Sequence, residues 1–176
     1  MPTIFTHAVV PLAVAAAAGG ARISPKLAAA GAVFAILPDA DVAGFALGIE
    51  YADEWGHRGA THSIAFAGIC AGGLALVWRE ARSLTAFLFL TFAMASHGLL
   101  DTLTSGGLGA ALWWPWDNTR IFAPYTPIRV SPIGLNFFSA RGLATLMSEL
   151  KWVWLPCLAF ALAGWGVRRA IRTHAA

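Results

Sequence analysis

Apolar residues are gathered in long blocks along this chain and do not alternate with polar residues. Five such blocks stand between short polar or charged stretches, at residues 4–20, 27–48, 61–78, 83–101 and 150–167. A helix needs about 20 apolar residues to cross a bilayer, whereas alternation would indicate strands. The pattern predicts an all-α integral membrane protein with about five transmembrane helices. Because the sequence has no internal repeat or low-complexity linker, residues 1–176 are expected to form a single domain.

Two prolines modify the predicted helices. Pro11 predicts a kink in the first block. Pro38, within "LPDAD" (37–41), predicts that the second helix is broken or partly re-entrant. A secretory signal would begin with basic residues, and none precedes the first block, so we expect that block to be a retained helix.

The stretch between the fourth and fifth blocks, residues 102–149, contains no comparable apolar block. Its proline and glycine residues are dense in "APYTPIRVSPIG" (123–134), which predicts turns and short extended pieces rather than another helix across the membrane. The tryptophans of "ALWWPW" (111–116) suit the headgroup region of a bilayer. We therefore expect residues 102–149 to form a long external segment.

Composition supports the membrane class. The chain is 58% hydrophobic and only 12% charged, whereas a soluble domain carries about 25% charged residues. Its lysines and arginines are not interleaved with aromatic residues as a nucleic-acid groove requires, so no nucleic-acid partner is expected. The expected partner is the lipid bilayer. Cys70 and Cys157 both fall inside apolar blocks and lack the spacing of a metal site.

Basic residues mark one side of the predicted bundle. They cluster within residues 22–26, 79–82 and 168–172, which follow the first, third and fifth blocks. Five crossings place these three clusters on the same side, which the positive-inside rule assigns to the cytoplasm. The N-terminus and the segment 102–149 are then expected outside, and the C-terminus in the cytoplasm.

Ionisable residues inside apolar blocks are costly and are candidates for function by default. With His57 and Arg58 just outside the third block, the set comprises His7, Asp39, Asp41, His57, Arg58, His62, His97 and Asp101. A helical rise of about 1.5 Å per residue places those inside the blocks roughly 20–27 Å from the cytoplasmic surface. Because the hydrocarbon core is about 30 Å thick, we expect these side chains to meet at one level near the outer face.

The stretch "HRGATHS" (57–63) carries two of these histidines. His57 and His62 are five residues apart, so both face one site only if His57 lies on a loop and His62 on the first turn of a helix. Gly59 would allow the bend between them, and Thr61 is the expected N-cap.

Two pairs of residues add donors from other helices. His97 and Asp101 stand four residues apart on one helical face, where they supply two ligands, or one ligand and the group that orients it. Asp39 and Asp41 would point in nearly opposite directions on a regular helix. We expect one of them to bind a metal ion and the other to orient a ligand or act as a base.

Histidine and carboxylate donors without cysteine suit zinc, with manganese or iron as alternatives. Four histidines and three aspartates are enough for two ions, which would together stabilise the attacking and leaving oxygens of a phosphoryl displacement. Arg58 suits a phosphate because its planar guanidinium pairs with two oxygens. A catalytic role is therefore expected for Asp39, Asp41, His57 and Arg58.

The motifs also resemble a known family. Thr6-His7, "LPDAD" (37–41), "HRGATHS" (57–63) and "HGLLD" (97–101) occur in the order found in the YdjM-type family. These are bacterial inner-membrane proteins described as LexA-regulated, membrane-bound, metal-dependent hydrolases. The resemblance covers about the first 100 residues and the "WWPW" region, and "HRGATHS" is its most specific part.

That family is distantly similar to zinc-dependent phospholipase C and the fungal zinc nucleases, which are all-helical enzymes. The resemblance implies metal-ligand roles for His7, one of Asp39 and Asp41, His57, His62, His97 and Asp101. It implies one or two zinc ions, since this chain lacks the extra downstream ligands of the soluble enzymes and His174 is the one histidine after Asp101. It also implies a location in the bacterial inner membrane.

Three functions are compatible with these features. The first is a metal-dependent hydrolase that acts on phosphoester bonds of a lipid or lipid-linked substrate. The second is a metal or proton translocator that uses the same cluster as a relay, although the cytoplasmic halves of the blocks are apolar. The third is a non-catalytic structural protein held by interhelical hydrogen bonds. Such bonds contribute only about 0.6 kcal/mol each in membranes, which favours the hydrolase.

Overall fold

The computed structural model describes residues 1–132 and 134–174, and within these residues it is helical without a regular strand. The α-helices are α1 (Ile4–Ala18), α2 (Pro25–Ile36), α3 (Ile64–Val77), α4 (Leu84–Thr102), α5 (Ala140–Glu149) and α6 (Leu155–His174). The 3-10 helices are η1 (Leu37–Leu47), η2 (Ala60–His62), η3 (Arg79–Arg82) and η4 (Gly134–Phe138), and η5 (Leu150–Trp154) is a π-helical turn. The all-α membrane class is confirmed.

All five predicted blocks are helical, but their lengths differ. Three continuous helical stretches are long and apolar enough to cross a membrane: Pro25–Leu47, Leu84–Thr102 and Ala140–His174. The other two, α1 and α3, are apolar helices of 15 and 14 residues. At a rise of about 1.5 Å per residue, each of these covers less than the full hydrocarbon core on its own.

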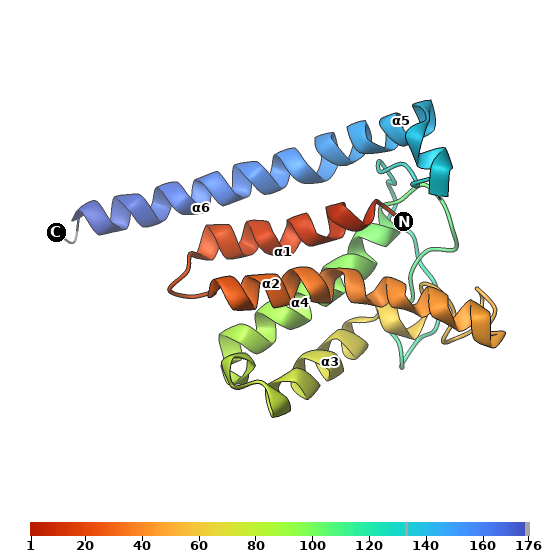
Figure 1. Cartoon of the computed structure of the whole chain (residues 1–176), viewed down its shortest axis with the longest axis horizontal. Coiled ribbons are helices and arrows are strands. Elements are labelled where there is room, and N and C mark those ends of the chain that lie inside the picture. Colours follow the sequence, from red (N-terminus) through yellow and green to blue (C-terminus); the bar gives the residue numbers. More distant parts are fainter. Residues whose placement is uncertain (133, 175–176) are drawn as a thin grey trace.

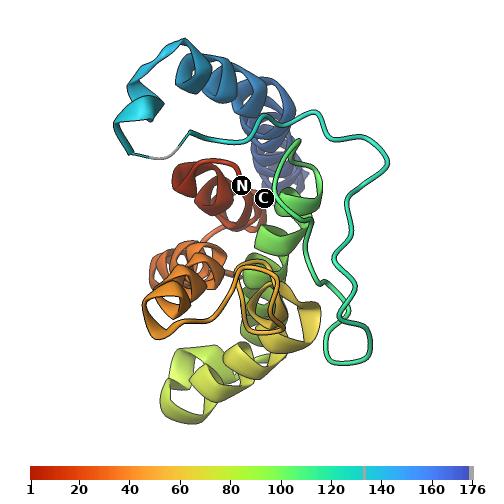
Figure 2. The same cartoon turned by 90° about the vertical axis from the view of Figure 1, so that its right-hand side faces the viewer.

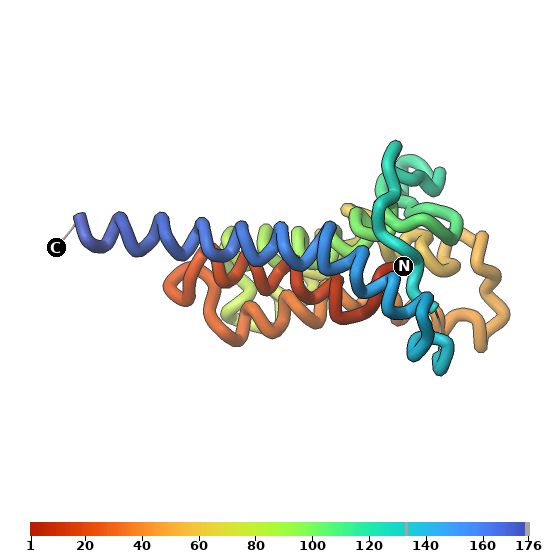
Figure 3. Tube along the Cα trace, turned by 90° about the horizontal axis from the view of Figure 1, so that it is seen from above, coloured from red at the N-terminus to blue at the C-terminus, as the bar shows by residue number. Residues whose placement is uncertain are grey.

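The helices lie side by side in the order α6, α1, α2, α4, α3 (Figures 1 and 2). The core between them is rich in small residues, among them Ala67, Ala71 and Ala93, which let helix backbones approach closely. At Gly31 the ring of Phe89 packs against the backbone of α2, and an added Cβ would lie 2.5 Å from that ring, so the ring would have to shift. Helix α6 covers α1 on one side and extends beyond it towards the C-terminus (Figure 3).

Serines at the starts of α2, α3 and α4 accept hydrogen bonds from the backbone of the first turn. For α3 the cap is Ser63, whose Oγ lies 3.0 Å from the N–H of Phe66. The prediction that Thr61 caps this helix is therefore wrong. Both residues have a capping side chain, but Thr61 lies within η2 and donates its hydroxyl to Asp41 instead.

Pro38 marks the change predicted for the second block. It follows the end of α2, and the chain continues as the 3-10 helix η1 rather than as α-helix. The last block begins earlier than predicted. Residues 140–149 of the expected irregular segment form α5, which runs through η5 into α6. This decapeptide is amphipathic rather than uniformly apolar, so a search for apolar blocks misses it.

The two ends of the bundle differ in chemistry. At the turn end, made by residues 19–24 and 78–83, Lys26 lies 3.4 Å from Glu80, and Arg168 donates to the carbonyl of Ala17. The three basic clusters of the sequence therefore share one end, as five alternating crossings require. The opposite, loop end holds the N-terminus and residues 37–62, 103–132 and 134–139 (Figure 1).

Candidate metal site

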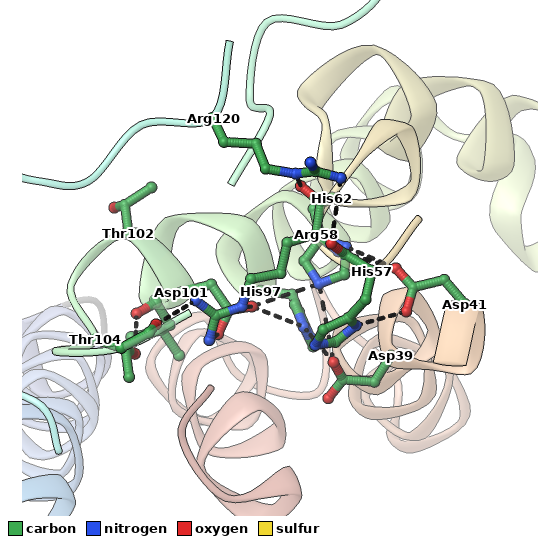
Figure 4. Close-up of polar contacts among 12 residues, drawn as sticks. Asp39, Asp41, His57, Arg58, His62, His97, Asp101, Thr102, Thr104 and Arg120 are labelled. Atoms are coloured by element: carbon green, nitrogen blue, oxygen red, sulfur yellow. Dashed lines mark hydrogen bonds and ion pairs between the residues drawn. The ribbon is translucent and has the colours of Figure 1, made fainter. Parts of the chain in front are cut away.

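Four ligand-type side chains from three elements converge at the loop end (Figure 4). Asp39 comes from η1, His62 from η2, and His97 and Asp101 from α4, and one donor atom of each lies within 4.8 Å of the others. His97 Nε2 is 3.3 Å from Asp39 Oδ1, and His62 Nε2 is 3.4 Å from Asp101 Oδ2. We call these four residues the ligand cluster.

A backbone carbonyl fixes the tautomer of His97. Its Nδ1 lies 2.7 Å from the oxygen of Ala35, which can only accept a hydrogen bond. Nδ1 must therefore carry the proton. In a neutral ring this leaves a lone pair on Nε2, the atom that faces Asp39. This arrangement is typical of histidines that bind metal ions.

A hydroxyl fixes His62 in the same way. Thr61 Oγ1 donates to Asp41 Oδ2 at 2.7 Å, so its oxygen is free to accept from His62 Nδ1 at 3.0 Å. His62 Nδ1 then carries the proton and Nε2 presents a lone pair to the carboxylates of Asp39 and Asp101.

The inward-facing atoms of the ligand cluster make no hydrogen bond. Within the described residues these buried atoms are both oxygens of Asp39, Nε2 of His62 and His97, and Oδ2 of Asp101. Leaving such a group unpaired costs about 1–3 kcal/mol, and more if it is charged. Lone pairs of nitrogen and oxygen that face each other at 3.3–3.4 Å repel unless a proton or a metal cation lies between them. The donor set therefore fits a metal ion, and two histidines with two carboxylates suit zinc.

Asp41 lies beside the ligand cluster, but its oxygens are already occupied. They accept from His57 Nδ1 at 2.7 Å, from the Thr61 hydroxyl at 2.7 Å and from the N–H of Arg58 at 3.3 Å. Asp41, His57 and His62 also form a second group with the spacing of metal ligands. Here the hydrogen bonds already satisfy the carboxylate, so Asp41 is better suited to orient a metal ligand than to be one.

Arg58 is buried, and its guanidinium faces Asp101. Nε lies 3.0 Å from Asp101 Oδ2, and one terminal nitrogen donates to the carbonyl of Gly106 at 2.8 Å. Its backbone has φ 67°, an unusual value for a side-chain-bearing residue. Gly59 makes the bend possible by its size, since a Cβ there would lie 2.1 Å from the carbonyl oxygen of Glu54. The φ of Gly59 itself is an ordinary −85°.

His7 adjoins the ligand cluster without belonging to it. Its ring stacks on His97 with centroids 3.7 Å apart and an interplanar angle of 11°. It is fully buried, and neither of its ring nitrogens has a hydrogen-bond partner in the part of the chain described. The structure thus brings every predicted site residue to one region, with His7 on its α1 side and His57 on its loop side.

Glu149, which the sequence placed in the external segment, is fully buried beside α1. Its carboxylate accepts from the N–H and hydroxyl of Thr3 and from the hydroxyl of Thr6, at 2.5–2.7 Å. Trp154 also donates to Thr6 Oγ1 at 2.7 Å. These bonds tie the start of α1, next to His7, to the end of α5 and to η5. The one feature of the sequence that could have indicated this role is the position of an acidic residue directly before the apolar block 150–167.

Arg120 was also missed, because a single arginine in a proline-rich segment gives no pattern. It donates to the carbonyls of Tyr51, Ala52 and Asp53 at 2.8–2.9 Å, which holds the loop that leads to His57. Tyr51 packs edge-on against the ring of His57, and burial raises the pKa of its phenol above the ordinary value. Arg120 therefore braces the loop that carries Tyr51 and leads to His57.

Fold and site together define the class: an all-helical membrane protein with a buried His/Asp cluster that could hold a metal ion. The chain belongs to the YdjM family, because the family model described as "YdjM inner membrane protein" matches residues 1–175. It is 42% identical over 173 residues to inner membrane protein YbcI of Escherichia coli (strain K12), which covers 96% of this chain and 100% of that protein. No solved structure gives a significant match. The resemblance is confirmed, and it extends well past the motifs in the first 100 residues.

Proposed function

We propose that this protein is a metal-dependent hydrolase that cleaves phosphoester bonds in a lipid or lipid-linked substrate. The observation that carries the proposal is the set of buried donor atoms of Asp39, His62, His97 and Asp101 that make no hydrogen bond within the described residues, although Asp101 Oδ2 is ion-paired with Arg58 Nε at 3.0 Å. These four residues would hold zinc, with manganese or iron as alternatives. Bound there, a divalent ion would polarise a phosphoryl oxygen and lower the pKa of water.

Charge balance also supports a cation. Asp39, Asp41 and Asp101 bring three carboxylates to a buried site, and Arg58 brings one fixed positive charge. Buried charges persist when they are paired or coordinate a metal. One divalent ion would neutralise the excess of two negative charges while the histidines stay neutral. A second ion is expected only if His57 and Asp41 exchange their mutual hydrogen bond for coordination.

Hydrolysis adds the oxygen of water to phosphorus while the bond from phosphorus to the ester oxygen breaks. One proton leaves the water, and the departing alcohol takes one up. We assign this transfer to His57, because Asp41 binds its Nδ1 and leaves Nε2 free. Arg58 makes three contacts with Asp101 and Gly106, and a guanidinium has five N–H bonds. Its remaining N–H groups are assigned to the phosphoryl oxygens.

The apolar core below the site favours a hydrolase over a relay. From the ligand cluster towards the turn end, the described core is dominated by apolar side chains such as Phe89, Leu90 and Met94, and the buried hydroxyls of Ser96 and Thr91 are its polar groups on α4, without an ionisable side chain. A proton or metal path would need ionisable groups through this layer. By the positive-inside rule, the site lies on the outer side of the inner membrane and the C-terminus in the cytoplasm.

Metal analysis of the detergent-purified protein tests the proposal, with hydrolysis of phospholipid diesters and monoesters measured on the same samples. The informative pair is H97Q and H174Q, since His97 lies in the ligand cluster and His174 is exposed at the far end of α6. We expect one or two ions per chain, with metal and turnover lost in H97Q and unchanged in H174Q. Wild-type protein that binds no metal, or H97Q that retains full turnover, would refute it.

A further inference from the structure

Asp39 is the member of the ligand cluster that lies nearest the molecular surface. Its side chain is 10% exposed, whereas those of His62, His97 and Asp101 are completely buried. Both carboxylate oxygens of Asp39 are themselves buried, so a substrate that approaches from this side meets the stem of Asp39 before any ligand atom. The surroundings of this residue decide what kind of molecule can do so.

Asp39 lies at the edge of an apolar groove between α1 and the α2–η1 stretch. The groove has a volume of about 370 Å³ and is lined by Ile4, Val33, Ile36, Leu37, Asp39 and Ala40. Ile4, Val33 and Leu37 are each more than 40% exposed. Because the α2–η1 stretch is one of the helices of spanning length and the groove is apolar and exposed, we expect it to face lipid. Asp39 is its one charged residue.

The loop side of the site is closed by comparison. Arg120 is bound to three backbone carbonyls of residues 51–53, and Trp114 donates to Glu54 at 2.6 Å. Behind this cover, His57 and Arg58 are both less than 9% exposed. A cavity of about 210 Å³ on that side is lined by Arg120 and Glu54 but by no residue of the ligand cluster.

We propose that the substrate reaches the site sideways from the bilayer, through the groove between α1 and α2–η1. This inference rests on the proposed hydrolase function and names its substrate class: a membrane-embedded lipid phosphoester. Its phosphate lies at Asp39 and the metal site, while its hydrocarbon chain lies across Ile4, Val33 and Leu37. A water-soluble phosphoester lacks the chain that would occupy the groove.

A tryptophan substitution can narrow the groove without touching the cluster. Val33 and Leu88 are similarly exposed, at 55% and 56%, but Val33 lines the groove and Leu88 lies on α4 outside it. In nanodiscs, V33W is expected to lower turnover of a dioleoyl phospholipid about tenfold or more with bound zinc unchanged, and L88W to leave it unchanged. Wild-type turnover of p-nitrophenyl phosphate should be far slower than that of the lipid. Full lipid turnover by V33W, or equal turnover of both substrates, would overturn lateral access.

A second measurement needs no turnover and separates the two proposals. In vesicles that contain a phospholipid with a diazirine in its acyl chain, we expect more photolabelling of the peptides that contain Ile4 and Val33 than of the peptide that contains Leu88. It should fall in V33W. Equal labelling of all three peptides would refute the groove as a lipid site. Labelled protein that binds zinc but hydrolyses no phosphoester would instead refute the hydrolase function and leave a lipid-binding groove.

Discussion

His62 is the residue on which the two halves of the site depend. Its Nε2 faces Asp39 and Asp101 in the ligand cluster, and its Nδ1 faces Thr61 and Asp41 outside it. The imidazole ring of His62 therefore lies between ligand atoms that make no hydrogen bond and the carboxylate of Asp41, whose hydrogen bonds are satisfied. This separation gives the two neighbouring aspartates different expected roles.

Substitution of the two aspartates by asparagine should separate these roles. D39N removes a charged donor from the ligand cluster and should abolish high-affinity zinc binding. D41N removes an orienting partner of His57 and His62 and should weaken zinc binding by about 10–100-fold without abolishing it. Competition with a zinc chelator measures both affinities. E80Q at the turn end, which affects only exposed contacts with Lys26 and Ser24, is the control. Equal loss in D39N and D41N would contradict the assignment.

At the scale of elements, the site depends on how closely α4 approaches η2. Gly98 lies between the ligands His97 and Asp101 and packs against the backbone of His62, which is also a ligand. A Cβ on Gly98 would lie 2.2 Å from the carbonyl oxygen of His62. The spacing of the ligand cluster is thus set by a missing side chain. A single methyl group there must push α4 and η2 apart.

The variant G98A should consequently lose both stability and metal affinity. Overpacking of this kind costs about 1–3 kcal/mol, and it also separates His62 from His97. The matched control is G68A in α3, where an added Cβ meets nothing within 4 Å and helix propensity alone should stabilise slightly. Thermal unfolding in detergent and zinc content are measured for both. The account fails if G98A unfolds and binds zinc as G68A does.

The elements and residue types of the site were predictable, but the assignment of Asp39 and Asp41 was not. The histidine and aspartate positions follow from charges placed in apolar blocks. The division between the two aspartates depends on η1, since a 3-10 helix places residues i and i+2 about 120° apart, against about 160° in an α-helix. That narrower angle lets Asp39 and Asp41 flank His62 from two sides. Pro38 predicted a break there without specifying its geometry.

Other features depend on contacts between distant parts of the chain. Ser63 rather than Thr61 caps α3 because Asp41, some 20 residues earlier, accepts the hydroxyl of Thr61. Arg120 and Glu149 find their partners 60 or more residues away in sequence. No local pattern of polar and apolar positions encodes such pairings, so sequence reasoning places these residues in a featureless external segment.

For the whole molecule, a bound ion would join η1, η2 and α4. Its binding free energy would then add to the free energy of unfolding, since the unfolded chain has no preformed site. Chelation by EDTA is expected to lower the unfolding temperature of the wild-type protein and leave that of D39N unchanged. Readdition of zinc should restore the wild-type value. An equal effect of EDTA on both proteins would show that the ion acts elsewhere.

Orientation in the membrane is a second property of the whole molecule. Single cysteines at Asp117 in the loop-end segment and at Arg172 in α6, on a background without Cys70 and Cys157, report on the two ends. In intact bacterial spheroplasts, a membrane-impermeant thiol reagent should label D117C and not R172C. Lysis should expose both. The reverse pattern would place the site on the cytoplasmic side.

The bonds between Glu149 and the first residues of the chain have a consequence for biosynthesis. Thr3 and Thr6 leave the ribosome almost 150 residues before Glu149 and Trp154. The start of α1, next to His7, therefore waits without its polar partners until α5 and η5 have been made. Synthesis of α5 and η5 thus becomes the step that completes the α1 side of the site, and a chain released before Glu149 would lack the carboxylate that holds Thr3 and Thr6.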